Sequence, residues 1–153
     1  MAQREILTIP QWENFLRQKA RDVEEFDERL HQLLDDMKET LYKRDGVGLA
    51  APQVGVRRRV VVVDAGDGLI ELINPEIAWV DGEQIGEEGC LSIPGVQKRV
   101  VRPMSVAVRA KDRHGKNVKF NGIGLKARAF CHEIDHLNGV LFIDRVQDPE
   151  GQE

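Results

Sequence analysis

The sequence lacks the features that mark nucleic-acid-binding, membrane and secreted proteins. Its 153 residues carry 22 Lys and Arg against 26 Asp and Glu, so the formal net charge is −4. Because positive charge attracts nucleic acids and anionic membranes, we expect no direct nucleic-acid binding and no membrane partner. No apolar run approaches the length of a membrane-spanning helix, and the polar first residues are unlike a secretory signal. These absences predict a cytoplasmic protein.

Cysteine is also scarce, with two residues in the chain. Cytosolic thiols are kept reduced, so we expect Cys90 and Cys131 to bind metal, act in catalysis or be buried rather than form a disulfide. With 41% hydrophobic residues, a chain of this length can bury one core and has no room for a second. We therefore predict one domain over residues 1–153.

Hydrophobic periodicity predicts two long helices. Leucine and methionine recur at helical spacing between Asp27, which suits the N-cap, and Arg44, with Gly46 just past the end. The second helix lies near the C-terminus and is expected to stop at Gly139. Its two neighbouring stripes are Leu125, Ala129, His132 and His136, and Phe130, Ile134, Leu137 and Leu141.

The segment between the helices reads as a series of strands. Four valines at residues 60–63 predict a buried strand, and the preceding Arg57, Arg58 and Arg59 are expected at its solvated edge. Further strands are expected at 69–73, 77–80, 83–87, 96–102, 104–111 and 117–121, in a meander with turns at 64–68 and 81–82. The predicted fold is α+β, with antiparallel strands packed around a C-terminal HExxH helix and a second amphipathic helix near the N-terminus.

The clearest chemistry lies in the HExxH motif of residues 132–136. Two histidines four residues apart share one face of a helix, so His132 and His136 can bind one metal ion with Glu133 beside them. A catalytic metal usually has three protein ligands and keeps one position for water. Only 17 residues follow His136, so we expect the third ligand from upstream.

The residues alone leave the third ligand open. The candidates are Cys90, Cys131, His31, His114 and a large set of carboxylates. Cys131 adjoins His132 on the helix, so its side chain points about 100° away and is expected in the core. His31 lies off the apolar stripe of its helix, and His114 lies in a turn, so both are expected at the surface. Cys90 differs from the other candidates because it lies within the segment EGCLSIPG, residues 88–95.

Three segments, in this order, resemble the signature motifs of bacterial peptide deformylase. They are residues 46–53 (GVGLAAPQ), 88–95 (EGCLSIPG) and 132–139 (HEIDHLNG). A weaker resemblance elsewhere extends the match over most of the chain and implies a single deformylase-like catalytic domain over residues 1–153. It implies a metal-dependent hydrolase that removes the N-formyl group from the N-terminal formylmethionine of newly made polypeptides and releases formate. The substrates would be N-formylmethionyl peptides or nascent chains.

The resemblance also implies the site residues. The metal ligands would be Cys90, His132 and His136, and metal-bound hydroxide would attack the formyl carbon while Glu133 serves as general base and then acid. Gln53 and the Leu91 N–H would stabilise the oxyanion. The implied substrate-binding residues are Gly46, Val47, Gly48, Glu88, Gly89, Leu125 and Ala129. Of these, Leu125, Ala129 and the glycine-rich loop would form an apolar pocket for the methionine side chain.

The metal, the ion pairs and the contact with the ribosome are further expectations. Mixed sulfur and nitrogen ligation by itself favours zinc, whereas the resemblance implies one divalent ion, Fe(II), with Zn, Ni or Co as other occupants. It also implies an ion pair between Asp45 and Arg102, although Glu88 is a second candidate partner for Arg102. The ribosome would be a transient partner, and the short acidic tail, residues 147–153, predicts no strong docking through that segment.

Two other interpretations of the motifs are open. An HExxH metallopeptidase that cleaves internal peptide bonds is the alternative enzyme, but its third ligand has no downstream position in this chain. A structural metal site or a degenerate binding module is the alternative without catalysis. The presence of Glu133 and Gln53 beside all three implied ligands argues against it.

Overall fold

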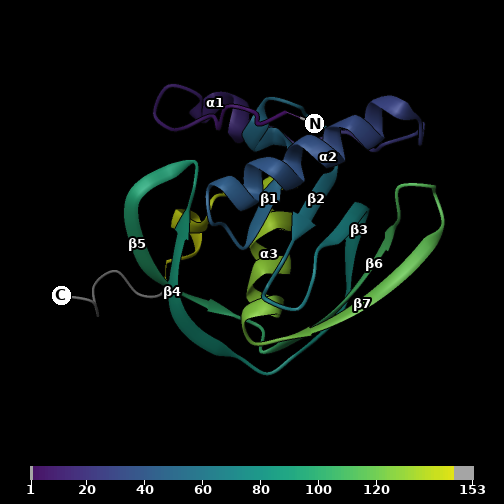
Figure 1. The fold of residues 1–153 in the computed structure, drawn as a ribbon. Coiled ribbons are helices and arrows are strands. Elements are labelled where there is room, and N and C mark those ends of the chain that lie inside the picture. Colours follow the sequence, from purple (N-terminus) through teal and green to yellow (C-terminus); the bar gives the residue numbers. More distant parts are fainter. Residues whose placement is uncertain (1, 147–153) are drawn as a thin grey trace.

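A computed structural model describes residues 2–146 and shows an α+β fold, as predicted (Figure 1). The helices are α1 (Glu13–Leu16), α2 (Glu28–Lys43) and α3 (Leu125–Leu137), with short 3-10 helices η1 (Ala51–Val54) and η2 (Phe142–Arg145). The strands are β1 (Gly48–Ala50), β2 (Val60–Val63), β3 (Ile70–Asp81), β4 (Gln84–Cys90), β5 (Ile93–Arg102), β6 (Ser105–Lys111) and β7 (Asn117–Ile123). Among the described residues, no helix is long and apolar enough to cross a membrane.

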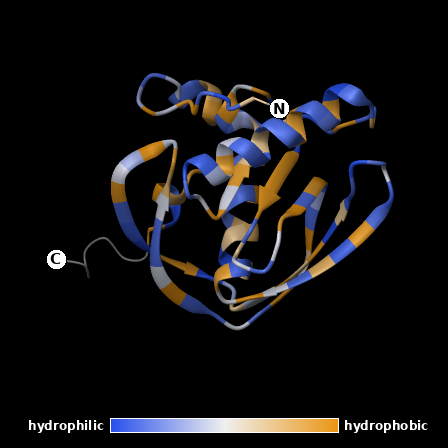
Figure 2. Ribbon diagram, in the orientation of Figure 1, coloured by the Kyte–Doolittle hydropathy of each residue, from blue (hydrophilic) through white to orange (hydrophobic). Residues whose placement is uncertain are grey.

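Two antiparallel sheets surround helix α3. The larger has the strand order β1-β2-β3-β6-β7, and β4 and β5 form a separate two-stranded ribbon. Strand β2 is buried on both faces, and its successive side chains alternate between these faces. Val61 and Val63 pack in the cluster that contains α3, whereas Val60 and Val62 pack with the apolar side of α2. Figure 2 shows β2 hydrophobic along its length and α2 of mixed hydropathy.

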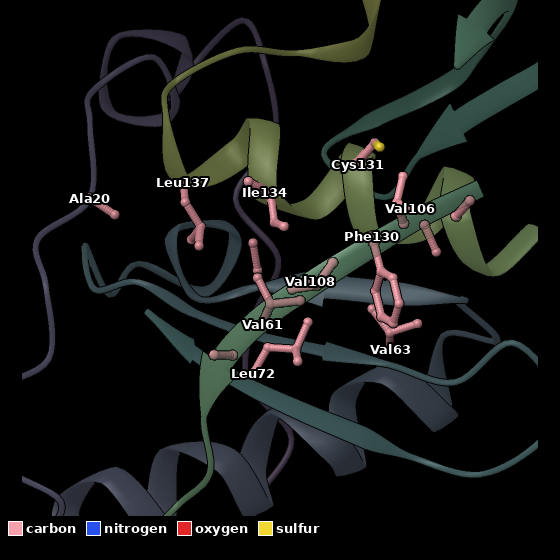
Figure 3. Close-up of a cluster of buried hydrophobic side chains, with 14 residues drawn as sticks. Ala20, Val61, Val63, Leu72, Val106, Val108, Phe130, Cys131, Ile134 and Leu137 are labelled. Carbon is pink, nitrogen blue, oxygen red and sulfur yellow. The ribbon is translucent and has the colours of Figure 1, made fainter. Parts of the chain in front are cut away.

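The apolar stripe of α3 packs on the larger sheet. Phe130 and Ile134 point toward Val61, Val63 and the neighbouring strands (Figure 3). Cys131 belongs to the same buried cluster, as predicted, and burial raises the pKa of its thiol to about 11. The helix ends at Leu137, and Gly139 follows with a φ of 77°. Packing therefore fixes the rotation of α3 about its axis, so the histidines face away from the sheet.

Helix α2 begins and ends as predicted, with Asp27 and Arg44 as its caps and Gly46 just past the end. Asp27 is the N-cap, and its side chain accepts a hydrogen bond from the backbone N–H of Leu30 at 3.2 Å. The chain leaves the helix through Asp45, which has a φ of 55°, rather than through Gly46. Aspartate tolerates this left-handed conformation better than most residues. Gly46 instead allows close packing, because a Cβ there would lie 3.0 Å from Leu41 Cδ1.

Three expectations from the sequence need correction. Residues 70–81 form one strand rather than two, with register shifts around Pro75, which cannot donate a ladder hydrogen bond. The chain turns at Gly82 into a different sheet, so β3 pairs with β6 and not with β4. Arg59 is not a solvated edge residue, because it donates hydrogen bonds to Leu137 O (2.8 Å) and Asn138 Oδ1 (2.9 Å). It thus caps the carbonyl end of α3.

Candidate metal centre

The three expected ligands come from two separate elements. Cys90 ends strand β4, and His132 and His136 lie one turn apart on α3. Cys90 Sγ is 3.3 Å from His136 Nε2, and the ligand atoms of all three side chains lie within 4.8 Å of one another. Of the candidates that the sequence left open, Cys90 is the one that joins the histidines within the described residues. His31 instead contacts the Arg113 carbonyl, and His114 is exposed.

Glu88 orients the first histidine. Its Oε1 is 2.9 Å from His132 Nδ1, which leaves His132 Nε2 as the free ligand atom. The same carboxylate accepts two hydrogen bonds from Arg102, at 2.7 and 2.9 Å, and one from Arg128 at 2.8 Å. Burial raises the pKa of Glu88, but the hydrogen bonds from Arg102 and His132 outweigh it and lower the value to about 2. A permanently ionised carboxylate therefore fixes the His132 ring.

Arg102 does not form the ion pair that the family resemblance implies. Besides Glu88, it donates to Asp135 Oδ2 at 2.8 Å, and Asp135 also accepts from Arg145 at 2.6 and 3.1 Å. The expected pair between Asp45 and Arg102 is wrong, because Arg102 makes its ion pairs with Glu88 and Asp135, whereas Asp45 lines the cavity. The second candidate, Glu88, is the true partner.

Glu133 is held beside the ligands, and no side chain in residues 2–146 pairs with its Oε1. Its side chain is buried, and Oε1 has no hydrogen-bond partner among the described residues. A Cβ on Gly48 would lie 2.7 Å from Glu133 Oε2, so only glycine leaves room for the carboxylate. Burial raises the pKa of Glu133 to about 7. An unpartnered buried oxygen is rare in native proteins, and this one fits a site that takes up a water or an ion.

The charges of the centre favour a cation. Burial lowers the pKa of His132, but Glu133, Cys90 and Glu88 outweigh it and raise the value to about 10. Burial and the neighbouring His132 lower the pKa of His136 well below its ordinary value, and its Nδ1 has no partner among the described residues. The residues around the two rings thus stabilise one positive charge. A thiol and two imidazoles are also a donor set that divalent transition metals prefer, so the residues fit a metal ion.

Hydrogen bonds fix the Gln53 side chain next to Cys90. Its Oε1 accepts from the Ala50 N–H at 2.9 Å, so its Nε2 must be the atom that faces Cys90 Sγ at 3.6 Å and Ser92 Oγ at 3.2 Å. The side chain is 1% exposed, which locks this orientation. Ser92 was missed from the sequence, because a serine within a motif gives no local sign that it will be buried.

A cavity of about 890 Å³ opens in front of the ligands. The residues predicted from the sequence gather on its wall, and they are Gly46, Val47, Gly48, Gln53, Glu88, Gly89, Cys90, Leu91, Leu125, Ala129, His132 and Glu133. His136 lies behind them and is buried. Leu125 is 53% exposed and forms part of the rim, whereas Ala129 is buried. The Glu88 carboxylate is turned from the cavity toward His132 and two arginines.

An HExxH helix inside antiparallel sheets, with a cysteine and a buried glutamate at the two histidines, defines the class of metal-dependent hydrolases. Residues 3–152 match the family model described as polypeptide deformylase. The chain belongs to the peptide deformylase family. Enzymes of this family remove the formyl group from N-terminal formylmethionine, so the predicted activity is confirmed in preference to a general HExxH peptidase.

Named relatives support this assignment over nearly the whole chain. The peptide deformylase of Caldicellulosiruptor bescii is 56% identical over 146 residues, covering 95% of this chain and 87% of the relative. That of Thermoanaerobacter pseudethanolicus is 59% identical and covers 86% and 82%. The Thermotoga maritima crystal structure has a TM-score of 0.92 at 42% identity, covering 97% of this chain and 100% of the other. The Synechococcus elongatus enzyme in complex with actinonin has a TM-score of 0.89 at 43% identity, covering 95% and 79%.

Proposed function

We propose that Cys90, His132 and His136 bind one divalent metal ion and that deformylation takes place in front of it. The observation that carries this proposal is the unpartnered Glu133 oxygen beside three converging ligand atoms. When bound, such an ion acts as a Lewis acid and lowers the pKa of a water so that hydroxide is available near neutral pH. The remaining steps belong to side chains of this chain.

Glu133 acts as the general base and then as the general acid. A carboxylate whose pKa lies near 7 can accept a proton from water and return it to the leaving amine at neutral pH. Because Oε1 makes no hydrogen bond to the described residues, it is free to take that proton. Gly48 keeps the space that the carboxylate needs.

Gln53 and the Leu91 N–H stabilise the oxyanion that forms on the formyl oxygen. Because Oε1 of Gln53 is anchored, Nε2 lies at the edge of the cavity next to Cys90, where one N–H donates to Ser92 Oγ and the other is the oxyanion donor. A fixed donor of this kind needs no reorganisation during the reaction, and each one typically contributes about 3–4 kcal/mol. Leu91 follows Cys90 directly and lines the same cavity.

The methionine side chain binds against the glycine-rich segment and the first turns of α3. Gly46, Val47 and Gly48 form one wall of the cavity, and Leu125 and Ala129 form the other. Gly89 and Glu88 contribute to substrate binding through their backbone, since the Glu88 side chain is occupied by His132 and two arginines. The S. elongatus relative was solved with actinonin, and we expect actinonin to compete with substrate for this cavity.

The resident ion that we propose is Fe(II), because membership of the family implies it. Zn, Ni or Co are other occupants, since a thiolate with two imidazoles also suits these metals. We also propose a cytoplasmic location, a single domain over residues 1–153 and nascent chains as substrates, with transient ribosome contact. The larger sheet supports the single domain, since it joins strands from residue 48 to residue 123. The acidic tail, residues 147–153, lies outside the described residues.

Formate release from formyl-Met-Ala-Ser tests the proposal. Protein purified without oxygen and loaded with Fe(II) should release formate rapidly, and removal of the metal by a chelator should abolish the release. Acetyl-Met-Ala-Ser and unblocked Met-Ala-Ser serve as matched controls that should stay intact. Cleavage of an internal peptide bond without formate release would support the metallopeptidase alternative instead.

A further inference from the structure

An arginine outside the three motifs lies at the junction between the two parts of the metal centre. Arg128 is one helical turn before His132, so it occupies the same face of α3 as the histidines. That face meets the β4–β5 ribbon, and the Arg128 side chain is 9% exposed. A long charged side chain is seldom covered to this extent without partners.

The Arg128 guanidinium reaches both strands of the ribbon. Nη1 lies 2.8 Å from Glu88 Oε2, 3.3 Å from Gly86 O and 3.2 Å from Val100 O, and Nη2 lies 3.4 Å from Gln84 Oε1. Gly86 and Val100 face each other across the β4 and β5 ladder. One side chain of α3 therefore holds a paired position of the ribbon as well as the carboxylate that orients His132.

Gly86 provides the space for this guanidinium. A Cβ at residue 86 would lie 2.9 Å from Arg128 Nη2 and 3.4 Å from its Cζ. The φ of Gly86 is not in the left-handed region, so its backbone does not require glycine. Residues 86 and 88 point to the same side of β4, because side chains alternate along a strand. The absence of a side chain at 86 thus lets Arg128 lie flat against the ribbon.

The contacts between the ribbon and the histidine face of α3 are polar. They include Glu88 with His132, Arg102 with Asp135, and Cys90 with His136. The buried apolar residues of the ribbon, Ile93 and Val100, pack instead with Leu16, Leu141 and Phe142. Hydrogen bonds and ion pairs, of which Arg128 makes several, therefore join the ribbon directly to the histidine face, and the apolar cluster packs beside them.

We propose that Arg128 is a positioning residue, which holds the β4–β5 ribbon against α3 and so sets the distance from Cys90 to His132 and His136. Gly86 leaves the space in which its guanidinium lies. The inference rests on the proposed metal centre. It differs from a general role in folding because it predicts a loss of metal affinity that depends on residue 86. Partners behind the ligands commonly change metal affinity by about 10–100-fold.

Zinc affinity, measured by competition with a chelator, tests this proposal. Arg128→Met keeps the length of the side chain without its donors, and we expect its zinc dissociation constant to rise about 10–100-fold. Gly86→Ala should weaken zinc binding in the same range, because its methyl group displaces the guanidinium. In the Gly86→Ala/Arg128→Met double variant, the alanine should add no further loss. Thermal unfolding of the metal-free proteins controls for the fold.

Three results would overturn the inference. If the parent binds zinc and Arg128→Met binds it equally well, the arginine does not position the ligands. If the losses of zinc affinity in the two single variants add in the double variant, Gly86 does not act through Arg128. If Arg128→Met raises KM for formyl-Met-Ala-Ser while zinc affinity is unchanged, Arg128 only lines the substrate cavity. A parent that binds no zinc would refute the proposed metal centre itself, which distinguishes the two failures.

Discussion

Helix α3 lies between two regions that hold it by different forces. On one side Phe130 and Ile134 pack among the valines of the larger sheet, in a cluster whose members are almost all apolar. On the other side His132 and Arg128 meet the β4–β5 ribbon through the Glu88 carboxylate. Apolar packing tolerates small shifts, whereas metal ligands and hydrogen bonds need set distances. The sheet side therefore stabilises the fold, and the ribbon side sets the geometry of the metal ligands.

The largest effect is expected at the metal centre, from loss of the proton acceptor that lies between the ligands and Gly48 of β1. Glu133→Gln keeps the shape of the side chain but cannot take a proton, so we expect formate release to slow by about 10²–10⁴-fold. Metal content and the unfolding midpoint should stay at the parental values, because no ligand is lost. A variant as fast as the parent would show that another group accepts the proton.

The next largest effect is a loss of stability when a buried side chain on the sheet side is truncated. Phe130 is fully buried, and Phe130→Ala should lower the free energy of unfolding by about 3–5 kcal/mol. Ile123→Ala is the matched control, since Ile123 is 71% exposed and its truncation should change stability by less than about 0.5 kcal/mol. Urea unfolding measures both. Equal losses at the two positions would contradict the assignment of the core.

A smaller effect is expected when the ribbon side loses the carboxylate behind His132. Glu88→Gln should raise the metal dissociation constant about 10–100-fold, because the His132 ring loses its charged partner. Glu87→Gln is the control, since Glu87 is the exposed neighbour on the other side of β4. Competition with a chelator measures both variants. If Glu87→Gln weakened binding as much, general charge and not the hydrogen bond would be the cause.

The smallest effect concerns a buried carboxylate on α2, away from both sides of α3. Burial raises the pKa of Asp36, but hydrogen bonds from Ala2 N–H, Gln32 and Arg4 outweigh it and lower the value below 3.8. A lowered folded pKa stabilises the protein above the unfolded value, about pH 3.9, and that contribution is lost as the pH falls through the folded value.

Stability measured against pH tests this expectation. Asp36→Asn should reduce stability at neutral pH and flatten its decline below about pH 4. The exposed Glu25→Gln should leave the curve unchanged. An unaltered acid limb in Asp36→Asn would show that the carboxylate titrates alike in the folded and unfolded chains.

The two sides of α3 also differ in how far the sequence predicts them. Helices α2 and α3 and strand β2 follow from local periodicity, because burial repeats at 3.6 residues in a helix and every residue of a doubly covered strand is apolar. The HExxH spacing likewise places His132 and His136 on one face. These features depend on residues close together in the chain, so the pattern is visible without a structure.

The ribbon side depends on contacts that no local pattern reveals. Cys90 reaches the histidines because β4 leaves the larger sheet at Gly82, and the sequence predicted one meander instead. Arg102 was assigned to Asp45 through family resemblance, yet it pairs with Glu88 and Asp135. Arg128 was missed because a single arginine on an amphipathic helix usually lies on its solvated face. Partners of buried charges are chosen by the tertiary structure.

The visible absorption spectrum of the cobalt(II)-loaded protein tests the central claim most directly. A thiolate ligand gives a sulfur-to-metal charge-transfer band, and the chain offers a matched pair of cysteines in Cys90 and Cys131. We predict that the parent and Cys131→Ser show this band and that Cys90→Ser lacks it. A band that persists in Cys90→Ser or disappears in Cys131→Ser would contradict a metal centre shared by the ribbon and α3.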